Sequence, residues 1–307
     1  MLNVSLELFA DEVVECVKEI LGDGYDIELR RVPKNNGIIL TGISICRAGE
    51  KVSPVIYLDD YYAERADTET EVELTARKIV NCFRYNGDLS DTVLKSAEHL
   101  YDFGKARDRV MLKLIHTKNN EQRLNQAPNI PYLDLSIVFY LYMDEDSGSM
   151  MTAQIQNEHL ALWGVDTQML YRIALQNMQR VMPAQINSIT QIIEDLKCAF
   201  GEEPDEDRGE EDAPFYVLTT SRGINGAACM LYSGVLEKFA EQRGKDIIIL
   251  PSSVHEVLLL EDTGDIDCKA LTELVKCINA TEVPMEDVLS ENIYRYERIC
   301  NRITIIA

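Results

Sequence analysis

The chain has 307 residues, which is enough for two domains of ordinary size and a substantial buried core. Hydrophobic residues make up 46% of it and charged residues 27%, so its composition is that of a globular protein and not of a disordered one. The 52 acidic residues against 30 basic ones give a net charge of −22, which argues against binding to nucleic acid or to an anionic membrane surface.

The first 22 residues predict a packed helix. Apolar residues recur at steps of three and four from Leu6 to Ile20, and Gly22 is a suitable stop. The segment has no basic start and no unbroken apolar stretch, so it does not have the pattern of a signal peptide. No window of the chain reaches the roughly 18 consecutive apolar residues of a membrane span. We therefore expect a cytoplasmic protein with no membrane partner.

The cysteines and histidines do not form a metal-binding pattern. The eight cysteines are scattered without a C-x-x-C motif, and the four histidines lack H-E-x-x-H spacing. Cysteines on the apolar side of a predicted helix, such as Cys16 and Cys82, behave as small hydrophobic residues. The prediction is reduced structural thiols, no metal and no cofactor.

The N-terminal region predicts a hairpin followed by a helix. Residues 25–31 and 37–46 are strand-like and flank a turn-rich cluster that begins at Pro33. Thr68 and Glu71 have the spacing of a capping box ahead of an apolar helical stripe that ends near Phe83. A boundary within this part of the chain is expected near residues 88–105.

The middle region contains the most strand-like segment of the sequence. Residues 133–142 are β-branched and aromatic, and an acidic turn leads into a second strand at residues 150–155. Two capped helices are expected next, one starting at Asn157 and one at Asp166 or Thr167. A third helix is expected over residues 185–200.

Residues 201–214 are expected to be a linker. The segment GEEPDEDRGEEDA carries eight acidic residues and one arginine, and it has no apolar periodicity. Two interpretations remain open, a flexible connector and an acidic bait for a basic partner. This linker divides the chain into an N-terminal region of residues 1–200 and a C-terminal domain of residues 215–307.

The C-terminal domain predicts hairpins and helices in alternation. A first hairpin is expected from residues 215–219 and 227–232, followed by a helix that Ser233 caps and Gly244 ends. Further expected elements are a hairpin of residues 246–250 and 257–261, a helix over 269–279, and strands over 292–298 and 303–307. Hairpins joined by short loops favour an α+β class with mostly antiparallel sheets and flanking helices, in two main parts. The order of hairpin, short helix and glycine occurs in residues 133–164 and again in residues 215–244, which suggests an internal duplication.

Five segments carry a resemblance to a known family. They are DLSIVFYLYM (134–143), NEHLALWGVD (157–166), LYRIALQNM (170–178), ILPSSVHEVLLL (249–260) and ENIYRYERI (291–299). Together they resemble an uncharacterised bacterial family, common in anaerobic Firmicutes and classified as a domain of unknown function. The resemblance covers roughly residues 100–307. It implies a bacterial cytoplasmic protein, and it implies no activity, ligand or catalytic residue.

The densest group of chemically capable residues lies in the segment PSSVHEV. Ser252, Ser253, His255 and Glu256 bring nucleophile, base and acid types within five residues. A strand would direct His255 and Glu256 to opposite faces, and the chain has no G-x-S-x-G elbow. A hydrolase site and an ordinary turn with a hydrogen-bonded histidine both remain open.

A second candidate is the loop SRGING, which contains Arg222 and Asn225. A cation, an amide and free backbone N–H groups are the components of an anion-binding nest. The loop matches no phosphate-binding motif, so a small acidic ligand and an ordinary glycine-rich turn are alternatives. A ligand site becomes conceivable if Arg222 and His255 lie near each other.

The sequence therefore favours a binding or interaction module with an acidic surface and no recognisable catalytic machinery. Its charge suits a basic protein partner and not nucleic acid. The alternative is a hydrolase or a small-anion-binding domain that uses the Ser252/Ser253/His255 loop and Arg222. The oligomeric state stays open.

Overall fold

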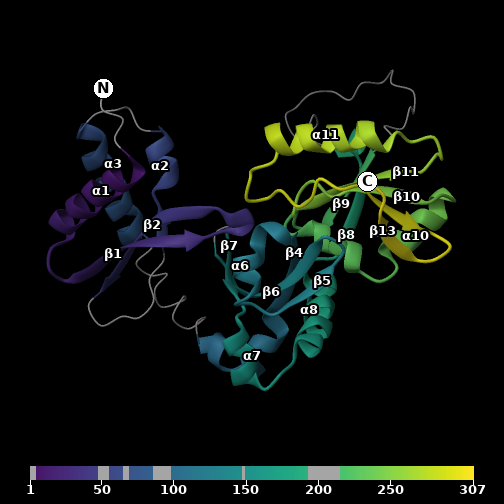
Figure 1. Cartoon of the computed structure of the whole chain (residues 1–307). Coiled ribbons are helices and arrows are strands. Elements are labelled where there is room, and N and C mark those ends of the chain that lie inside the picture. Colours follow the sequence, from purple (N-terminus) through teal and green to yellow (C-terminus); the bar gives the residue numbers. More distant parts are fainter. Residues whose placement is uncertain (1–4, 48–54, 65–68, 86–97, 147–148, 193–214) are drawn as a thin grey trace. The chain divides into compact units, whose positions relative to one another are not determined.

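The computed structural model describes residues 5–47, 55–64, 69–85, 98–146, 149–192 and 215–307 (Figure 1). These residues form two compact units, Met1–Asp102 and Phe103–Ala307. The sheets are antiparallel with flanking helices, which confirms the α+β class.

The N-terminal unit is a small three-stranded sheet covered by helices. Its elements are α1 (Leu6–Leu21), β1 (Tyr25–Pro33), η1 (Asn35–Gly37), β2 (Ile39–Arg47), β3 (Val55–Tyr57), α2 (Asp59–Glu64), α3 (Glu69–Tyr85) and η2 (Glu98–Tyr101). The strands pair in the order β1-β2-β3, which confirms the expected hairpin, and its turn contains Asn36 at φ 57°. The apolar stripes of α1 and α3 meet β2 in one core that includes Phe9, Ile43 and Ile79.

The second unit begins with a four-stranded sheet. Its elements up to the last helix before residue 182 are α5 (Phe103–Ala106), η3 (Arg107–Arg109), β4 (Val110–His116), η4 (Lys118–Asn120), α6 (Glu121–Leu124), β5 (Asn129–Tyr132), β6 (Leu135–Asp146), β7 (Ser149–Gln154), α7 (Asn157–Trp163) and α8 (Thr167–Val181). The long strand β6 pairs with β4, β5 and β7. It is the strand that the β-branched and aromatic run predicts. Asp166 is the N-cap of α8, whereas Gln156 and not Asn157 is the N-cap of α7.

The rest of the unit forms a six-stranded antiparallel sheet. Its elements are β8 (Ala184–Ser188), β9 (Phe215–Thr220), η5 (Gly226–Leu231), α10 (Val235–Arg243), β10 (Ile247–Leu250), β11 (Glu256–Glu261), α11 (Cys268–Thr281), β12 (Tyr294–Glu297) and β13 (Arg302–Ile305). The strand order is β13-β12-β10-β11-β9-β8. The predicted hairpin β10–β11, the helix α11 and the pair β12–β13 are confirmed.

Two expectations for residues 227–244 are wrong. Residues 227–232 do not pair with β9, because Gly226 N–H and Ala227 N–H donate to His255 O and Val254 O and the segment coils into η5. Its short apolar run fits a buried strand and a buried helical turn equally well. Ser233 does not cap α10, whose N-cap is Gly234 in the left-handed region. The second half of the suggested internal duplication therefore lacks its hairpin.

The segment before residue 192 also differs from the expectation. Residues 185–188 belong to β8, which pairs with β9, and residues 189–192 are helical. The remainder of the expected helix and the acidic linker lie outside the described residues. The strands on either side of them, β8 and β9, are neighbours in one sheet.

Candidate functional site

Polar side chains converge on one face of the four-stranded sheet. Lys113 of β4 pairs with Val138 of β6, and Gln154 of β7 pairs with Tyr140 of β6. Paired residues share a face, as do residues two apart in a strand. These side chains therefore lie together, although they come from three strands.

A cavity of about 180 Å³ lies over this face. Its lining consists of Lys113, Arg123, Val138, Phe139, Tyr140, Thr152, Gln154, Ile224, Asn225 and His255. Two of these residues are basic and none is acidic, in a chain whose net charge is −22. The cavity is thus a cationic, hydrogen-bonding pocket in an acidic protein.

Arg123 is the most informative residue of the cavity. It lies on α6 and is half-buried, and its Nε–H donates to Gln154 Oε1 at 2.7 Å. Burial lowers the pKa of its guanidinium. Among the described residues, no carboxylate lies within ion-pairing distance of this side chain. A desolvated guanidinium is normally paired with a negative charge, so the cavity offers its unfilled donors to an anion.

Tyr140 and Asn225 are a neutral, hydrogen-bonded pair in the lining of the cavity. Asn225 Nδ2 donates to Tyr140 Oη at 3.0 Å, and burial raises the pKa of Tyr140 to about 12. The phenol therefore stays protonated at physiological pH. Asn225 has a φ of 52°, and its backbone N–H donates to His255 Nδ1 at 3.2 Å.

The loop of residues 221–226 is fixed to the segment 253–255 by backbone bonds. Gly226 N–H donates to His255 O at 2.9 Å, and Thr219 Oγ1 donates to the same oxygen at 2.8 Å. Thr220 Oγ1 donates to Ile224 O at 2.9 Å, which closes the turn. A Cβ on Gly226 would overlap His255 O and Thr219 Cα, so the close approach depends on this glycine. These contacts hold Asn225 and His255 at the cavity.

The segment PSSVHEV is arranged differently from a catalytic triad. His255 Nε2 lies 3.2 Å from Asp287 Oδ1, and since Nδ1 accepts from Asn225, the Nε2 atom carries the proton. Ser253 Oγ accepts from the backbone N–H of His255 at 3.1 Å. Ser252 and Ser253 are both buried, and Glu256 is exposed at the start of β11. No hydrogen bond joins either serine hydroxyl to a His255 ring nitrogen.

Of the two loop candidates, Asn225 lines the cavity and Arg222 does not. Arg222 Nη1 donates to Tyr142 Oη at 3.4 Å, and its guanidinium lies 5.8 Å from the centre of that ring. Because Tyr142 follows Tyr140 by two residues on β6, the same loop contacts two successive residues of one strand face.

The residues that local reasoning missed come from distant parts of the chain. Lys113 had a visible signal, because it is the one charged residue in the apolar run VMLKLI. Arg123, Tyr140 and Asp287 had none. They reach the site only through the pairing of β4, β6 and β7 and the packing of two loops.

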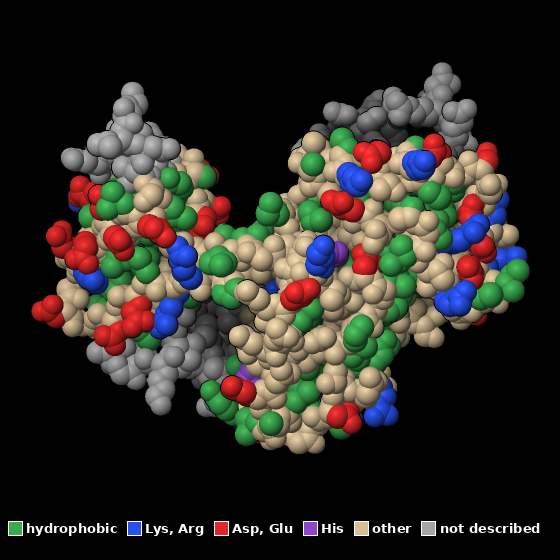
Figure 2. Space-filling model, viewed as in Figure 1, with side chains coloured by type: hydrophobic (Ala, Val, Ile, Leu, Met, Phe, Trp, Pro, Cys, Tyr) green, Lys and Arg blue, Asp and Glu red, His purple; other side chains and the backbone are tan. Residues whose placement is uncertain are grey.

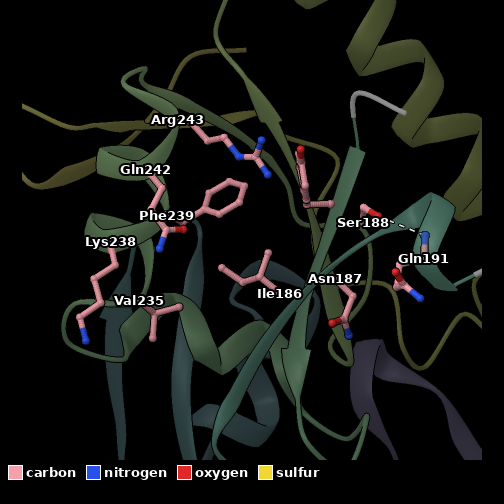
Figure 3. Close-up of a pocket in the computed structure, with 10 residues that line it drawn as sticks. Ile186, Asn187, Ser188, Gln191, Val235, Lys238, Phe239, Gln242 and Arg243 are labelled. Carbon is pink, nitrogen blue, oxygen red and sulfur yellow. Dashed lines mark hydrogen bonds between the residues drawn. The ribbon is translucent and has the colours of Figure 1, made fainter. Parts of the chain in front are cut away.

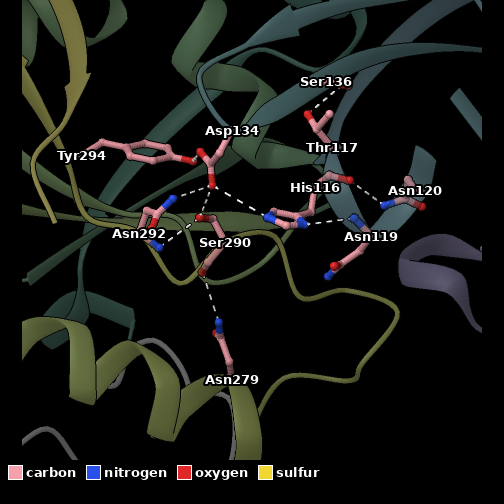
Figure 4. Close-up of polar contacts among 10 residues, drawn as sticks. All are labelled: His116, Thr117, Asn119, Asn120, Asp134, Ser136, Asn279, Ser290, Asn292 and Tyr294. Carbon is pink, nitrogen blue, oxygen red and sulfur yellow. Dashed lines mark hydrogen bonds and ion pairs between the residues drawn. The ribbon is translucent and has the colours of Figure 1, made fainter.

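A second polar cluster surrounds Asp134 (Figure 4). Its carboxylate accepts from Ser290 Oγ at 2.6 Å, from Asn292 Nδ2 at 2.9 Å and from Tyr294 Oη. His116 Nε2 lies 4.0 Å away. The carboxylate joins the turn before β6 to residues 290–294, and both of its oxygens accept hydrogen bonds from the protein. We therefore assign it a structural role.

Within the described part of the chain, no helix combines the length and apolar character needed to cross a membrane. The same residues contain no group of three or more His, Cys, Asp or Glu side chains placed to hold a metal ion.

Comparison with known protein families gives a match over most of the chain. A family model described as a family of unknown function, DUF5688, matches residues 6–298. The expected family of unknown function is confirmed, and the match begins at residue 6 and not near residue 100. Neither the curated proteins nor the solved structures contain a match.

Proposed function

The chain belongs to the DUF5688 family, a family of unknown function, and we propose from its own geometry that it binds a small anion in the cavity over β6. The observation that carries this proposal is the half-buried guanidinium of Arg123, which lacks a carboxylate partner among the described residues. A ligand carboxylate or phosphate would complete it.

The size of the cavity restricts the ligand. Its volume of about 180 Å³ is below the roughly 300–1,000 Å³ typical of sites for drug-sized molecules. A phosphate or a short carboxylate with a few further atoms fits such a space. Lys113 contributes a second cation, and Tyr140, Thr152 and Asn225 contribute polar atoms that orient the ligand.

We favour binding over hydrolysis because His255 has no free ring nitrogen. Its Nδ1 accepts from Asn225 N–H, and its Nε2–H faces Asp287. The hydrolase alternative requires Ser252 or Ser253 to donate to this ring, whereas the partners of its two nitrogens are Asn225 N–H and Asp287 Oδ1. His255 then acts as a positioning residue for Asn225.

The direct test is titration of the protein with phosphate, sulfate, acetate and small hydroxy acids, followed by calorimetry. Arg123→Gln removes the charge and keeps a hydrogen-bonding side chain, and we expect it to weaken binding by about 10- to 100-fold, since bonds to a charged group contribute about 1.5–3 kcal/mol. In the wild type, an anion at 100 times its Kd should raise the unfolding free energy by about 2.7 kcal/mol.

Arg172→Gln is the matched control, because Arg172 is an exposed residue of α8 outside the cavity. It should bind like the wild type. The proposal is wrong if no anion of the panel binds, or if the Arg123 and Arg172 variants bind equally well.

The charge of the chain supports a second binding role. The net charge is −22, and acidic side chains gather on the visible face of the N-terminal unit in Figure 2. This favours contact with a basic protein partner. Such a partner, captured at moderate salt, should be lost at high salt, because exposed charge pairs are screened beyond a Debye length of about 8 Å at physiological salt. A partner retained equally at both salt concentrations would contradict the charge-based contact.

A further inference from the structure

A groove separate from the anion cavity lies between β8 and α10. Its volume is about 410 Å³, and it shares no lining residue with the anion cavity. Figure 3 shows Ile186, Asn187 and Ser188 of β8 on one side and Lys238 and Phe239 of α10 on the other. An edge strand and a helix thus form its two walls.

The strand wall can accept a further strand. β8 stands at the end of the six-stranded order and pairs with β9 alone among the described strands. Unpaired edges are templates for another chain, and proteins usually protect them with charged residues or proline. β8 reads AQINS and contains neither. Its outer edge is therefore suited to pairing with an extended peptide.

The chemistry of the groove indicates which side chains such a peptide carries. The apolar floor of the groove is formed by Ile186, Val235 and Phe239. Positive charge comes from Lys238 and Arg243, and none of the lining residues is acidic. Arg243 stacks over the Tyr216 ring at 4.4 Å and has Glu261 at 3.8 Å. Lys238 is exposed and has no ion-pair partner in the described part of the chain. Lys238 is thus the cation available to a ligand.

We propose that this groove binds an extended acidic peptide of a partner protein by adding a strand to β8. Alternate side chains of a strand share a face, so one alternate set of peptide side chains faces α10. Within that set, apolar residues contact the floor and an acidic residue approaches Lys238. Backbone hydrogen bonds between the peptide and β8 supply affinity, and the charge of Lys238 supplies selectivity for acidic peptides. This inference does not depend on the anion cavity.

The probe is a fluorescent valine–glutamate peptide of about six residues, the usual strand length, in which one alternate set of positions carries valine, glutamate and valine and the other set carries threonine. We expect it to bind the full-length protein about fivefold more tightly than the matched valine–lysine peptide, since exposed charge pairs contribute up to about 1 kcal/mol. Lys238→Glu should reverse this preference. Lys269→Glu, the same change at an exposed residue of α11 away from the groove, should preserve it.

Backbone methylation tests strand addition itself. In an extended peptide, successive N–H groups point to opposite sides, so only one alternate set faces β8. N-methylation of that set should abolish binding, and methylation of the other set should be tolerated. Equal tolerance of both sets would show that the peptide does not pair with β8 and would overturn the proposal.

Two further outcomes would also overturn the proposal. One is the absence of binding by the valine–glutamate peptide. The other is a dimer, detected by sedimentation, that dissociates in Ile186→Lys. In that case a second copy of the chain, and not an acidic peptide, would occupy the edge of β8.

Discussion

Gly226 shows how one residue without a side chain determines the shape of a loop. A Cβ there would overlap His255 O and Thr219 Cα; Thr219 belongs to β9, and His255 O accepts from Thr219 Oγ1. We predict that Gly226→Ala destabilises the protein by about 1–3 kcal/mol, as overpacking commonly does. It should also weaken anion binding, because the neighbouring Asn225 would move.

The measurement is urea unfolding together with anion titration. Gly24→Ala is the control, because a Cβ at Gly24 has nothing within 4 Å and the residue does not require a positive φ. A Gly226→Ala variant that is as stable as the wild type would show that the contact between the loop and His255 is not tight.

Asp134 stabilises the fold in a different way, because its carboxylate accepts hydrogen bonds from three donors. Asp134→Asn would turn an amide N–H₂ toward groups that themselves donate, including the hydroxyl of Ser290. Burial raises the pKa of Tyr294, so its hydroxyl also remains a donor at neutral pH. We predict that Asp134→Asn lowers the free energy of unfolding by about 1–3 kcal/mol, which is the cost of leaving a buried polar group without a partner.

Chemical unfolding of Asp134→Asn, Tyr294→Phe and the double variant measures this coupling. The free energy of unfolding of the double variant should fall by less than the sum of the decreases in the two single variants. Additive losses would mean that Asp134 and Tyr294 do not act together.

Among single residues, the sequence indicates which residues belong to the candidate site better than it indicates which side chains contact one another. It placed Asn225 and His255 in candidate loops, and both residues line the cavity. It could not connect His255 with Asp287, or Asn225 with Tyr140, because each pair is joined only by the fold. Ser252 and Ser253 are close to His255 in sequence, but their orientation follows from the turn.

At the scale of elements, the helix α7 contains a pH-sensitive cap. The Nδ1 of His159 accepts from Gln156 N–H at 2.9 Å, so the cap requires this nitrogen to be unprotonated. Burial lowers the pKa of His159 below its usual value of about 6.5, against the opposing effect of Glu158. Between the folded and unfolded pKa values, the unfolded state binds more protons, so stability falls as the pH drops below about 6.5.

We predict that the wild type loses stability from pH 7.5 to 5.5 relative to His159→Gln, since glutamine keeps a capping side chain and does not titrate. Urea unfolding at both pH values measures the difference, and other titrating groups cancel in the comparison. The single tryptophan, Trp163, stacks on His159 with ring centres 5.7 Å apart and reports the local change by fluorescence. Equal pH dependence of the two proteins would contradict the role of the cap.

Elements were predictable where the pairing is local. The hairpins β1–β2 and β10–β11 have short turns, so their alternation and turn residues are both visible in the sequence. The apolar run of η5 has no period and therefore also fits a strand, and its backbone bonds go to residues 254 and 255. The sequence predicts a helix in place of β8, because the strand that pairs with β8 begins only at residue 215.

At the scale of the whole molecule, the anion cavity and the groove that we propose as binding sites belong to one unit. Every residue of the anion cavity and of the β8–α10 groove lies within Phe103–Ala307. The N-terminal unit has a hydrophobic core of its own, which contains Phe9 and Ile43. We therefore predict that residues 103–307 alone bind the anion with an affinity within about twofold of the full chain.

Calorimetry on the fragment and on its Arg123→Gln variant tests this prediction, with circular dichroism to confirm folding. A folded fragment that has lost anion binding would show that the N-terminal unit contributes to the site.

The pairing of β8 with β9 has a consequence for how this protein tolerates changes in length. Ser188 lies opposite Tyr216 in the ladder, so the intervening chain leaves and re-enters the sheet at neighbouring points. When the two ends of a segment are held at neighbouring points, doubling the length of flexible chain between them costs only about 0.6 kcal/mol. The position therefore suits insertion of a reporter domain, or removal of residues 201–213, without a change in strand register.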